Sequence, residues 1–401
     1  MIEAIKSQGP YRLYMHILVM TRIVLGHSLG GMQKQTMDLC QGFAKAGHRV
    51  TVITTGRKDG VSHEDNDGIE THYLEGTKPG YYSGKWNSAA RKKISEVHQS
   101  SPIDVIHSQS MGANGILKWA KRNAVPVVST WHGTSLTEFT SFFGSASYHP
   151  RYWHWLLITP TTWLKRYFTM ELPVRRASKA ITLVSPTLEH HMKLFAKDKV
   201  KVIPNGVHVP EQFAADKKND KTEIISIGRI VKQKGVQHAI HATANLPTEV
   251  KNKVHLNIVG SGDYLESLKR LTTRLEMQDM VTFHGRTVGD ELAAIYQRCE
   301  LHLMPTTSHE GLPLTILEGM AYGMATIASN IGGIPSAITD DVNGFLIKPG
   351  NVEQLTGRLQ ALLENPQRID EIGSAARETI IQHYSEEMMV EQTLAVFEAV
   401  V

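Results

Sequence analysis

Apolar positions along the chain fall into short runs, each followed by a longer amphipathic segment. The short runs are bounded by turn-forming residues and are typical of buried strands, while the longer segments have the three- to four-residue spacing of helices. Strands that alternate with helices form a parallel sheet covered on both faces, so the pattern predicts an α/β protein. The expected strands are 16–23, 50–55, 104–108, 125–130, 223–227, 254–259, 281–285, 301–304 and 325–329.

The alternation stops once and then restarts, which predicts two domains. Between the two series lies the polar stretch 205–219, whose charged and turn-forming residues are typical of a linker. We expect a first domain over residues 1–206, a second over 207–384, and a last helix over 385–401. The chain has 401 residues, 41% of them hydrophobic, enough for two cores. Ligands bind beyond the carboxyl ends of such strands, so two facing domains would form a cleft.

The net charge of +4 is unevenly distributed along the chain. Residues 1–206 contain 26 Lys and Arg against 14 Asp and Glu, and the remainder contains 17 against 25. A basic first half suits an anionic partner such as a phospholipid surface, a lipid diphosphate or a phosphorylated sugar. Solvated surface together with attraction between the two domains accounts for the same split equally well. We expect no nucleic-acid partner.

The sequence also indicates a compartment. Its two cysteines, Cys40 and Cys299, lie in different halves and make neither a disulfide framework nor a metal-ligand cluster. No apolar run approaches the about 20 residues of a membrane span, and residues 1–14 lack the apolar stretch of a signal peptide. We expect a cytoplasmic protein, at most peripheral at the inner face of a membrane.

Two glutamates eight positions apart, Glu310 and Glu318, stand in a segment that follows the expected strand 301–304. Pro313 between them suits the first turn of a helix. Three neighbouring residues could then present free backbone N–H groups to a phosphate: Gly311, Leu312 and Leu314. Glu318, about one and a half turns into that helix, could accept hydrogen bonds from two vicinal hydroxyls. The alternative is an ordinary helix, in which the N-terminal Glu310 interacts favourably with the helix dipole and Glu318 lies on a solvated face.

This segment resembles the signature of glycosyltransferase family 4, which is a Glu, seven residues and a second Glu. In that family the first Glu contacts the donor sugar and the second holds the nucleotide ribose. The resemblance therefore implies that Glu310 contacts the sugar and that Glu318 binds the ribose.

A second match to the family lies directly after the strand at 223–227. Its Gly-Arg and Lys-Gly pairs contain Arg229 and Lys234, which we expect to bind the diphosphate and to stabilise the charge that develops on the leaving group. The alternative is a basic loop in solvent. Lys232, between the two cations, fits that alternative better.

Two further matches follow strands of the first domain. Gly30 and Gly31 precede a helical pattern, and glycines there let the backbone approach a phosphate or sugar closely, although a simple turn explains them equally well. His132 stands where the family places a His near the donor sugar and the reacting centre. It could hydrogen-bond a sugar hydroxyl or the phosphate side of the transition state.

Three weaker matches lie at other strand ends or at the linker. Asn205 belongs to a Pro-Asn-Gly turn similar to the interdomain turn of the family, but His208 stands where an acidic residue is common. Gly260 could approach the nucleotide base, or could belong to a plain turn. Arg286 and Val288 match a base-contacting region in which the backbone would read the ring edge.

No metal is implied for the transfer reaction. Asp65 and Asp67 have an acidic spacing used by metal-dependent transferases of another fold, but they lie in a polar, Gly-bounded stretch that is typical of a solvated turn. Arg229, Lys234 and two helix N-termini already supply the positive charge that a metal would provide. We therefore expect no cofactor.

One stretch, 139–176, mixes aromatic and basic residues in a way that suits a membrane interface or an amphiphilic, anionic acceptor. Helices that pack their aromatics inward, or against a second subunit of a homodimer, are the alternative. The aromatic residues are Phe142, Phe143, Tyr148, Tyr152, Trp153, Trp155, Trp163, Tyr167 and Phe168, and the basic residues are Arg151, Lys165, Arg166, Arg175 and Arg176.

The resemblance spans nearly the whole chain and implies the GT-B fold, two Rossmann-like doubly wound domains facing across a cleft. It implies that the first domain supplies the acceptor site, that the second binds the nucleotide sugar, and that the last helix, 385–401, crosses back onto the first domain. It implies transfer with retention of a hexose or N-acetylhexosamine from a nucleotide diphosphate sugar, with UDP-glucose or UDP-N-acetylglucosamine favoured, to a glycan, glycolipid or small-molecule acceptor. The alternatives are a GDP-mannose-dependent mannosyltransferase, a nucleotide-sugar epimerase of the same fold and a non-catalytic sugar-nucleotide binding protein.

Overall fold

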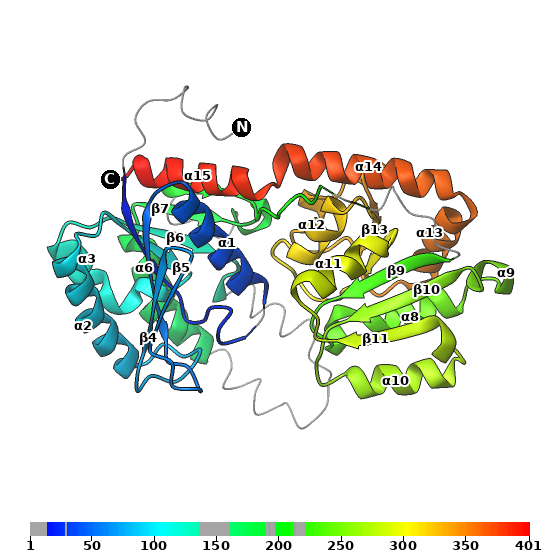
Figure 1. Ribbon diagram of the computed structural model, residues 1–401, viewed down its shortest axis with the longest axis horizontal. Helices are drawn as coiled ribbons and strands as arrows, with labels where there is room; N and C mark the ends of the chain where they lie inside the picture. Colours follow the sequence, from blue (N-terminus) through cyan, green and yellow to red (C-terminus); the bar gives the residue numbers. More distant parts are fainter. Residues whose placement is uncertain are drawn as a thin grey trace.

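Two separate sheets organise the protein, and each forms the centre of one half of the molecule (Figure 1). The computed structural model describes residues 14–28, 30–135, 161–189, 192, 197–211, 213 and 221–401. The first sheet has eight strands in the order β3-β4-β2-β1-β5-β6-β7-β8, and the second has six in the order β11-β10-β9-β12-β13-β14. All neighbouring strands are parallel except β3, which is antiparallel to β4.

The first sheet contains all the strands that the structure describes before residue 203. They are β1 (His16–Met20), β2 (Arg49–Thr55), β3 (His63–Asn66), β4 (Ile69–Leu74), β5 (Val105–Gln109), β6 (Val127–Trp131), β7 (Ala180–Leu183) and β8 (Val200–Val202). The helices around it are α1 (Gly31–Lys45), α2 (Gly84–Ser100), α3 (Leu117–Arg122) and α6 (Leu172–Ala177). Residues 161–177 are helical throughout and include a π-helical turn, Tyr167–Glu171.

The second sheet follows the same plan. Its strands are β9 (Thr222–Ile227), β10 (Val254–Val259), β11 (Val281–Gly285), β12 (Leu301–Met304), β13 (Ala325–Ser329) and β14 (Phe345–Ile347). Its helices are α8 (Val236–Ala244), α9 (Thr248–Lys251), α10 (Leu265–Arg274), α11 (Gly289–Arg298), α12 (Leu314–Ala321), α13 (Val352–Glu364) and α14 (Pro366–His383). The predicted α/β class, with two doubly wound parallel-sheet domains, is confirmed.

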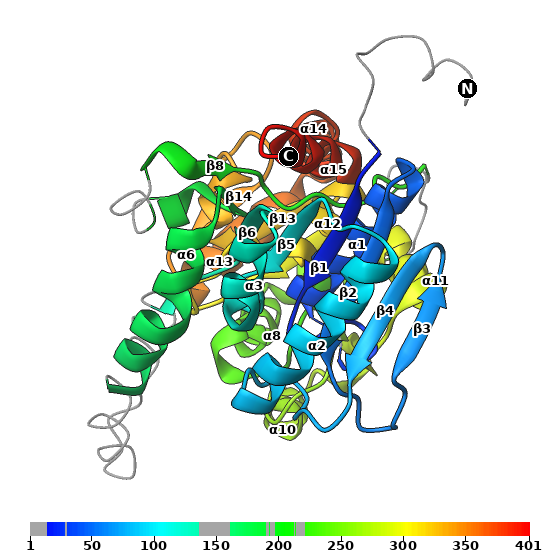
Figure 2. The same cartoon turned by 90° about the vertical axis from the view of Figure 1, so that its left-hand side faces the viewer.

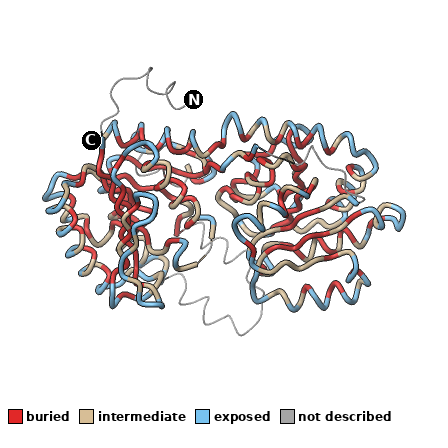
Figure 3. Tube along the Cα trace, viewed as in Figure 1, coloured by how far each residue is buried: buried red, intermediate tan, exposed pale blue. Residues whose placement is uncertain are grey.

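The central strands are buried on both faces, as Figure 3 shows for each half. All five residues of β1 are buried, because α2 covers one face of the first sheet and α1 covers the other. This double burial explains the continuous apolar runs that identified the central strands in the sequence. The two faces carry separate hydrophobic clusters, one around Trp86 and Ile94 of α2 and one around Leu39 and Phe43 of α1.

The last helix, α15 (Glu386–Glu398), packs against α1 rather than against the second sheet. Leu394 and Phe397 of α15 belong to the same cluster as Phe43 of α1, and Figure 1 shows α14 and α15 running in sequence along both halves. Gly42 permits this close packing, because a β carbon there would lie 2.2 Å from Val390.

The chain crosses between the two halves twice, and the two crossings are hydrogen-bonded to each other. The backbone N–H of Val207 donates to Tyr384 O at 2.9 Å, and the N–H of Glu386 donates to Val207 O at 3.0 Å. A bridge pairs Val207 with Ser385. The paired crossings fix where the two sheets face each other.

All nine strands expected from the sequence are present, but five others were missed. β3 carries only polar residues and lies at the sheet edge (Figure 2), and β8 and β14 have three residues each, so none has a readable period. Placing Asp65 in a turn was wrong: it lies within β3, and the turn is formed by Asp67 and Gly68, with φ of 53° and 77°. The helix after Pro313 begins at Leu314, so Pro313 directly precedes it.

We predict that Gly206→Ala destabilises the protein by about 1–3 kcal/mol, because a β carbon there would lie 2.3 Å from Ser385 O at the paired crossings. Urea denaturation measures the effect. The matched control is Gly357→Ala in α13, where a β carbon meets open space and a gain of about 0.5–1 kcal/mol is expected. A Gly206→Ala protein as stable as the wild type would contradict the close packing of the crossings.

Candidate active site

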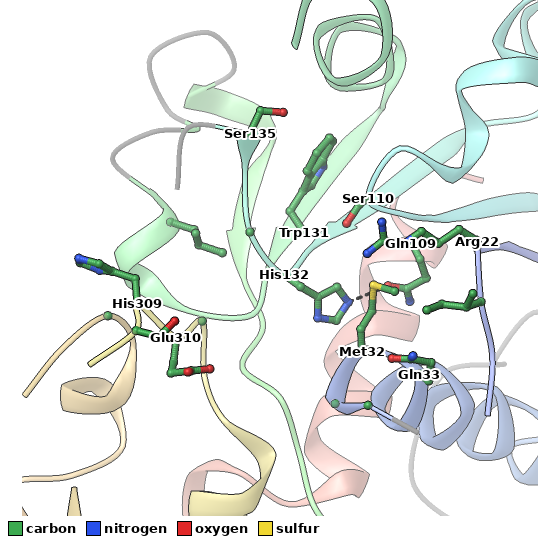
Figure 4. A pocket seen from close by; sticks show the side chains of 18 of the residues that line it. Arg22, Met32, Gln33, Gln109, Ser110, Trp131, His132, Ser135, His309 and Glu310 are labelled. Atoms are coloured by element: carbon green, nitrogen blue, oxygen red, sulfur yellow. Dashed lines mark hydrogen bonds between the residues drawn. The ribbon is translucent and has the colours of Figure 1, made fainter. Parts of the chain in front are cut away.

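A cleft of about 1140 Å³ lies between the two halves and is lined by residues from both. From the first half come loops and strand ends around Arg22, Gln109 and His132, and from the second come the loops that carry Arg229 and Glu310. Figure 4 shows His132 and Gln109 on one wall and Glu310 on the opposite side. The carboxyl ends of both sheets therefore contribute to one cavity.

Glu310 and Lys234 form the main polar contact of the second half within the cleft. The Lys234 Nζ donates to Glu310 Oε1 at 2.7 Å, and both side chains are largely buried, with 18% and 16% exposed. The loops that carry them are tied together by the Thr306 hydroxyl and the Thr307 N–H, which donate to Gln233 O at 3.0 and 2.8 Å. The positions of Glu310 and Lys234 are therefore coupled.

Arg229 is exposed and lines the same cleft, whereas Lys232 lies outside its lining. This placement agrees with the interpretation of Lys232 as a solvated surface residue. Gly235 closes the turn with φ of 78°, and a β carbon there would lie 1.9 Å from Pro305 O. The turn that carries Lys234 can therefore lie directly against the end of β12 only with glycine at its last position.

The start of α12 presents unused backbone donors. Within the described part of the chain, no group accepts a hydrogen bond from the N–H of Gly311, Leu312 or Leu314. Only the backbone of this segment is available to a ligand, because the side chains of Leu312 and Leu314 are buried in the core of the second half. Free N–H groups at a helix start bind anions.

The N-terminus of α1 meets the N-terminus of α12. A β carbon on Gly31 would lie 3.8 Å from Leu314 Cδ1, and Gly30 and Gly31 both line the cleft. A β carbon on Gly311 would lie 2.9 Å from His132 O, so the signature loop also touches the first half. Two positive helix ends converge on one region of the cleft.

His132 lies in the cleft as a neutral imidazole. Burial, with a smaller effect from the nearby Arg22 guanidinium, lowers the pKa of His132 to about 4. Its Nε2 lies 2.9 Å from Gln109 Oε1, and Figure 4 shows this pair. A neutral ring can hydrogen-bond a sugar hydroxyl, whereas it offers no positive charge to a phosphate.

Glu318 lies in α12. Unlike Glu310, it does not line the cleft. Its Oε2 accepts a hydrogen bond from the Tyr296 hydroxyl at 2.9 Å. Burial raises the pKa of the Glu318 carboxyl, and the nearby Lys34 ammonium opposes that rise. Tyr296 also stacks on Tyr322, with ring centroids 5.0 Å apart, so α11 holds Glu318 in place.

Three predicted base-contacting residues also lie outside the cleft lining. Gly260, with φ of 136°, follows β10, and a β carbon there would lie 1.9 Å from Gly228 O. Close packing of the ends of β9 and β10 therefore accounts for this glycine. Arg286 and Val288 follow β11 and are exposed.

Three further residues contribute to the site, and of these only Asn205 belongs to a sequence motif. Gln109, at the end of β5, binds His132, and its position after a buried strand was the available signal. Asn205, in the first crossing, donates from Nδ2 to Leu312 O at 2.9 Å and so supports the signature loop. The N–H of Gly333 donates a hydrogen bond to Glu310 O at 2.8 Å, and no local sequence pattern indicates this contact.

The aromatic and basic stretch 139–176 is only partly described, since residues 136–160 lie outside the described residues. Trp163 and Arg166 line the cleft, whereas Phe168 is 57% exposed. Arg175 is buried and pairs with Glu171 at 3.4 Å. The described part of the stretch thus faces both the cleft and solvent.

Across the described residues, the cleft is lined by no set of three His, Cys, Asp or Glu side chains placed to ligate a metal ion. Among the helices of these described residues, none has both the length and the apolar character needed to cross a membrane.

Comparisons with known proteins place the chain in a family. Residues 29–210 match the model described as Glycosyltransferase Family 4, and residues 209–379 match the model described as Glycosyl transferases group 1. The chain is 29% identical over 364 residues to a sulfoquinovosyl transferase of Arabidopsis thaliana, covering 87% of this chain and 67% of that protein. It is 25% identical over 384 residues to the N-acetyl-α-D-glucosaminyl L-malate synthase of Bacillus anthracis, covering 91% and 93%.

The fold resembles that of the Anabaena protein HepE, solved in complex with UDP and glucose. The TM-score is 0.73 at 19% identity, and the match covers 96% of this chain and all of that one. The chain belongs to glycosyltransferase family 4, has the GT-B fold and is a glycosyltransferase.

Three histidines with lowered pKa values predict an acid-sensitive fold. Burial lowers the pKa of His107 to about 3 and of His132 and His302 to about 4. In an unfolded chain a His pKa is about 6.5, so below that pH the unfolded state binds protons that the folded state does not. The free energy of unfolding therefore falls as the pH drops from about 6.5 towards 4, by about 2 kcal/mol per histidine at pH 5.

The substitution His302→Leu tests this loss of stability at low pH. Both ring nitrogens of His302 lack hydrogen-bond partners among the described residues, and His302 lies outside the cleft. The loss of stability between pH 7 and pH 5, from urea titrations, should shrink by about 2 kcal/mol relative to the wild type. His383→Ala, at an exposed position, should leave that loss unchanged. A His302→Leu protein as acid-sensitive as the wild type would show that His302 is protonated in the fold.

Proposed function

We propose that this glycosyltransferase transfers glucose or N-acetylglucosamine from the UDP sugar, with retention of anomeric configuration, to a hydroxyl of an anionic glycan or glycolipid precursor. The observation that carries the proposal is the convergence of two helix N-termini, free backbone N–H groups and the cations Arg229 and Lys234 on one cleft. A diphosphate carries about two negative charges and suits such a site. The complex of HepE with UDP and glucose supports uridine as the base and glucose as the sugar.

The leaving group determines the role of the cations. Negative charge grows on the diphosphate as the glycosidic bond breaks, so fixed positive charge and N–H groups favour the transition state over the bound substrate. In this proposal Arg229, Lys234 and the N–H groups of Gly311, Leu312 and Leu314 supply that charge, so transfer needs no metal. Gly30 and Gly31 let the start of α1 approach the same phosphate.

Glu310 acts on the sugar as a positioning and charge-stabilising group. Its 2.7 Å contact with Lys234 holds the carboxylate beside the diphosphate site, and the ion pair lowers its nucleophilicity. The acceptor hydroxyl then attacks the face that the diphosphate leaves, and a leaving phosphate oxygen takes the proton. Neutral His132 hydrogen-bonds a sugar hydroxyl.

Glu318 holds the ribose, and Tyr296 fixes its orientation from α11. Gly260, Arg286 and Val288 approach the base through their backbone at the ends of β10 and β11. These parts of the donor site lie beyond the main cleft, so ribose and base would extend from the diphosphate towards the second sheet.

The acceptor side supports an anionic substrate. Arg22 lines the first-half wall of the cleft and forms no ion pair within the described ranges, while Arg166 lines the same wall. The one acidic side chain of the described residues on that wall, Glu171, is paired with Arg175 and accepts a hydrogen bond from the N–H of Ser135 at 2.9 Å. The L-malate in the name of the Bacillus relative is consistent with a charged acceptor.

The donor site is tested by Lys234→Ala against Lys232→Ala, two lysines of one turn of which only the first lines the cleft. Lys234→Ala should weaken UDP binding about thirtyfold, equivalent to about 2 kcal/mol, because a charged hydrogen bond to phosphate is lost. Lys232→Ala should bind UDP within about twofold of the wild type. Isothermal titration with EDTA present measures both, and equal UDP affinities in the two variants would overturn the assignment.

The acceptor side is tested with matched neutral and anionic acceptors, such as glycerol against glycerol 3-phosphate, by measuring UDP release from UDP-glucose. The anionic member should have the higher kcat/KM, and Arg22→Gln should remove that preference while leaving UDP affinity unchanged. Equal kcat/KM values within each pair would show that the acceptor is not selected by charge, without affecting the donor assignment.

A further inference from the structure

Outside the cleft, one face of the β3-β4 hairpin gathers two histidines and a glutamate. His63 of β3 lies directly opposite His72 of β4 in the antiparallel register, and Glu70 lies two positions before His72. Residues two apart on a strand share a face, so all three side chains project from the same side of the hairpin. The hairpin forms the outer edge of the first sheet (Figure 2), and none of the three residues lines the cleft.

The distances match those between ligands of a tetrahedral metal ion. Both imidazoles approach the same carboxylate oxygen: Nε2 of His72 lies 3.0 Å and Nε2 of His63 lies 3.6 Å from Glu70 Oε1. Zinc bonds of about 2.0–2.1 Å at tetrahedral angles place neighbouring N and O ligands about 3.3 Å apart. The three ligand atoms all lie within 4.8 Å of one another, and half-exposed His63 can rotate to close the remaining distance.

The polar groups of this face are incompletely satisfied without an ion. Nε2 of His72 is inaccessible to solvent and has no hydrogen-bond partner of good geometry, despite its closeness to Glu70. The other glutamate oxygen, Oε2, lies 3.4 Å from Arg49 Nη2, which leaves Oε1 directed at the histidines. Asp65 pairs with Glu70 across the hairpin and lies on the same face.

The hairpin also holds the ligands in register. Asp67 and Gly68 form a two-residue turn with φ of 53° and 77°, the conformation that suits tight antiparallel hairpins. The ligands then come from two strands whose pairing is fixed by the turn, so binding an ion requires little rearrangement.

We propose that His63, Glu70 and His72 bind a divalent transition-metal ion of the zinc class, which links β3 to β4 at the open edge of the first sheet. Two imidazoles and one carboxylate suit zinc, nickel and copper but not magnesium, which prefers oxygen ligands. Two cations face the cluster, Arg49 from β2 and Lys93 from α2, the latter paired with Glu96 at 2.8 Å. Their charge weakens binding without blocking Glu70 Oε1.

The site is independent of the proposed sugar transfer. An ion bound only to the folded state stabilises that state in proportion to its concentration, so the expected effect is on the stability of the first half. It acts at an edge strand, which pairs with a neighbouring strand on one side only.

Untagged, EDTA-treated full-length protein titrated with ZnCl₂ by calorimetry should bind one ion per chain and melt at a higher temperature with it. His72→Ala and Glu70→Gln should each weaken zinc binding at least tenfold, whereas His383→Ala, an exposed histidine of α14, should not. MgCl₂ should produce no binding heat at the same concentration.

The far-UV circular dichroism spectrum of each variant shows whether it has folded, and should equal that of the wild type. Zinc binding that is absent from the wild type, or equally strong in His72→Ala and Glu70→Gln, would overturn the proposal. If a substituted protein does not fold, the visible spectrum of Co²⁺ added to the wild type decides instead: a tetrahedral spectrum supports the site and an octahedral one contradicts it.

Discussion

The hydrogen-bonded pair of chain crossings at Val207 and Ser385 is the constraint on which the arrangement of the molecule depends. Each sheet can fold around its own core, but their carboxyl ends form one cavity only if the two halves are held face to face. Gly206 lets the crossings approach, and α15 anchors the second crossing on the core of the first half.

The arrangement of charge in the cleft follows from the way the two crossings hold the halves face to face. The signature loop is supported from the first crossing by Asn205 and touches the first half at His132, so its free N–H groups are positioned by both halves. The Glu310 carboxylate pairs with Lys234. We expect a diphosphate at the helix N-termini to share Lys234 with Glu310, which keeps the carboxylate beside the sugar.

The central strands of both sheets and several residues of the cleft could be predicted from the sequence. The central strands are buried on both faces and so appear as apolar runs, and Lys234, Arg229 and Glu310 follow such runs at strand ends. The edge strand β3 could not be found, because its four polar residues depend on β4 for their structure. Tyr296 lies 22 positions before Glu318 on another helix, and only the packing of α11 beside α12 brings its hydroxyl to the carboxylate. The contribution of Gln109 could have been predicted, since Gln109 ends a buried strand and His132 directly follows another.

The central claim is that UDP binds where the start of α12 meets the start of α1, and hydrogen–deuterium exchange with and without UDP tests it most directly. The account predicts slower exchange at the backbone amides of Gly311, Leu312, Leu314 and Gly31, with smaller changes at exposed helices such as α10. Slower exchange confined to other surfaces, with these amides unchanged by saturating UDP, would contradict it.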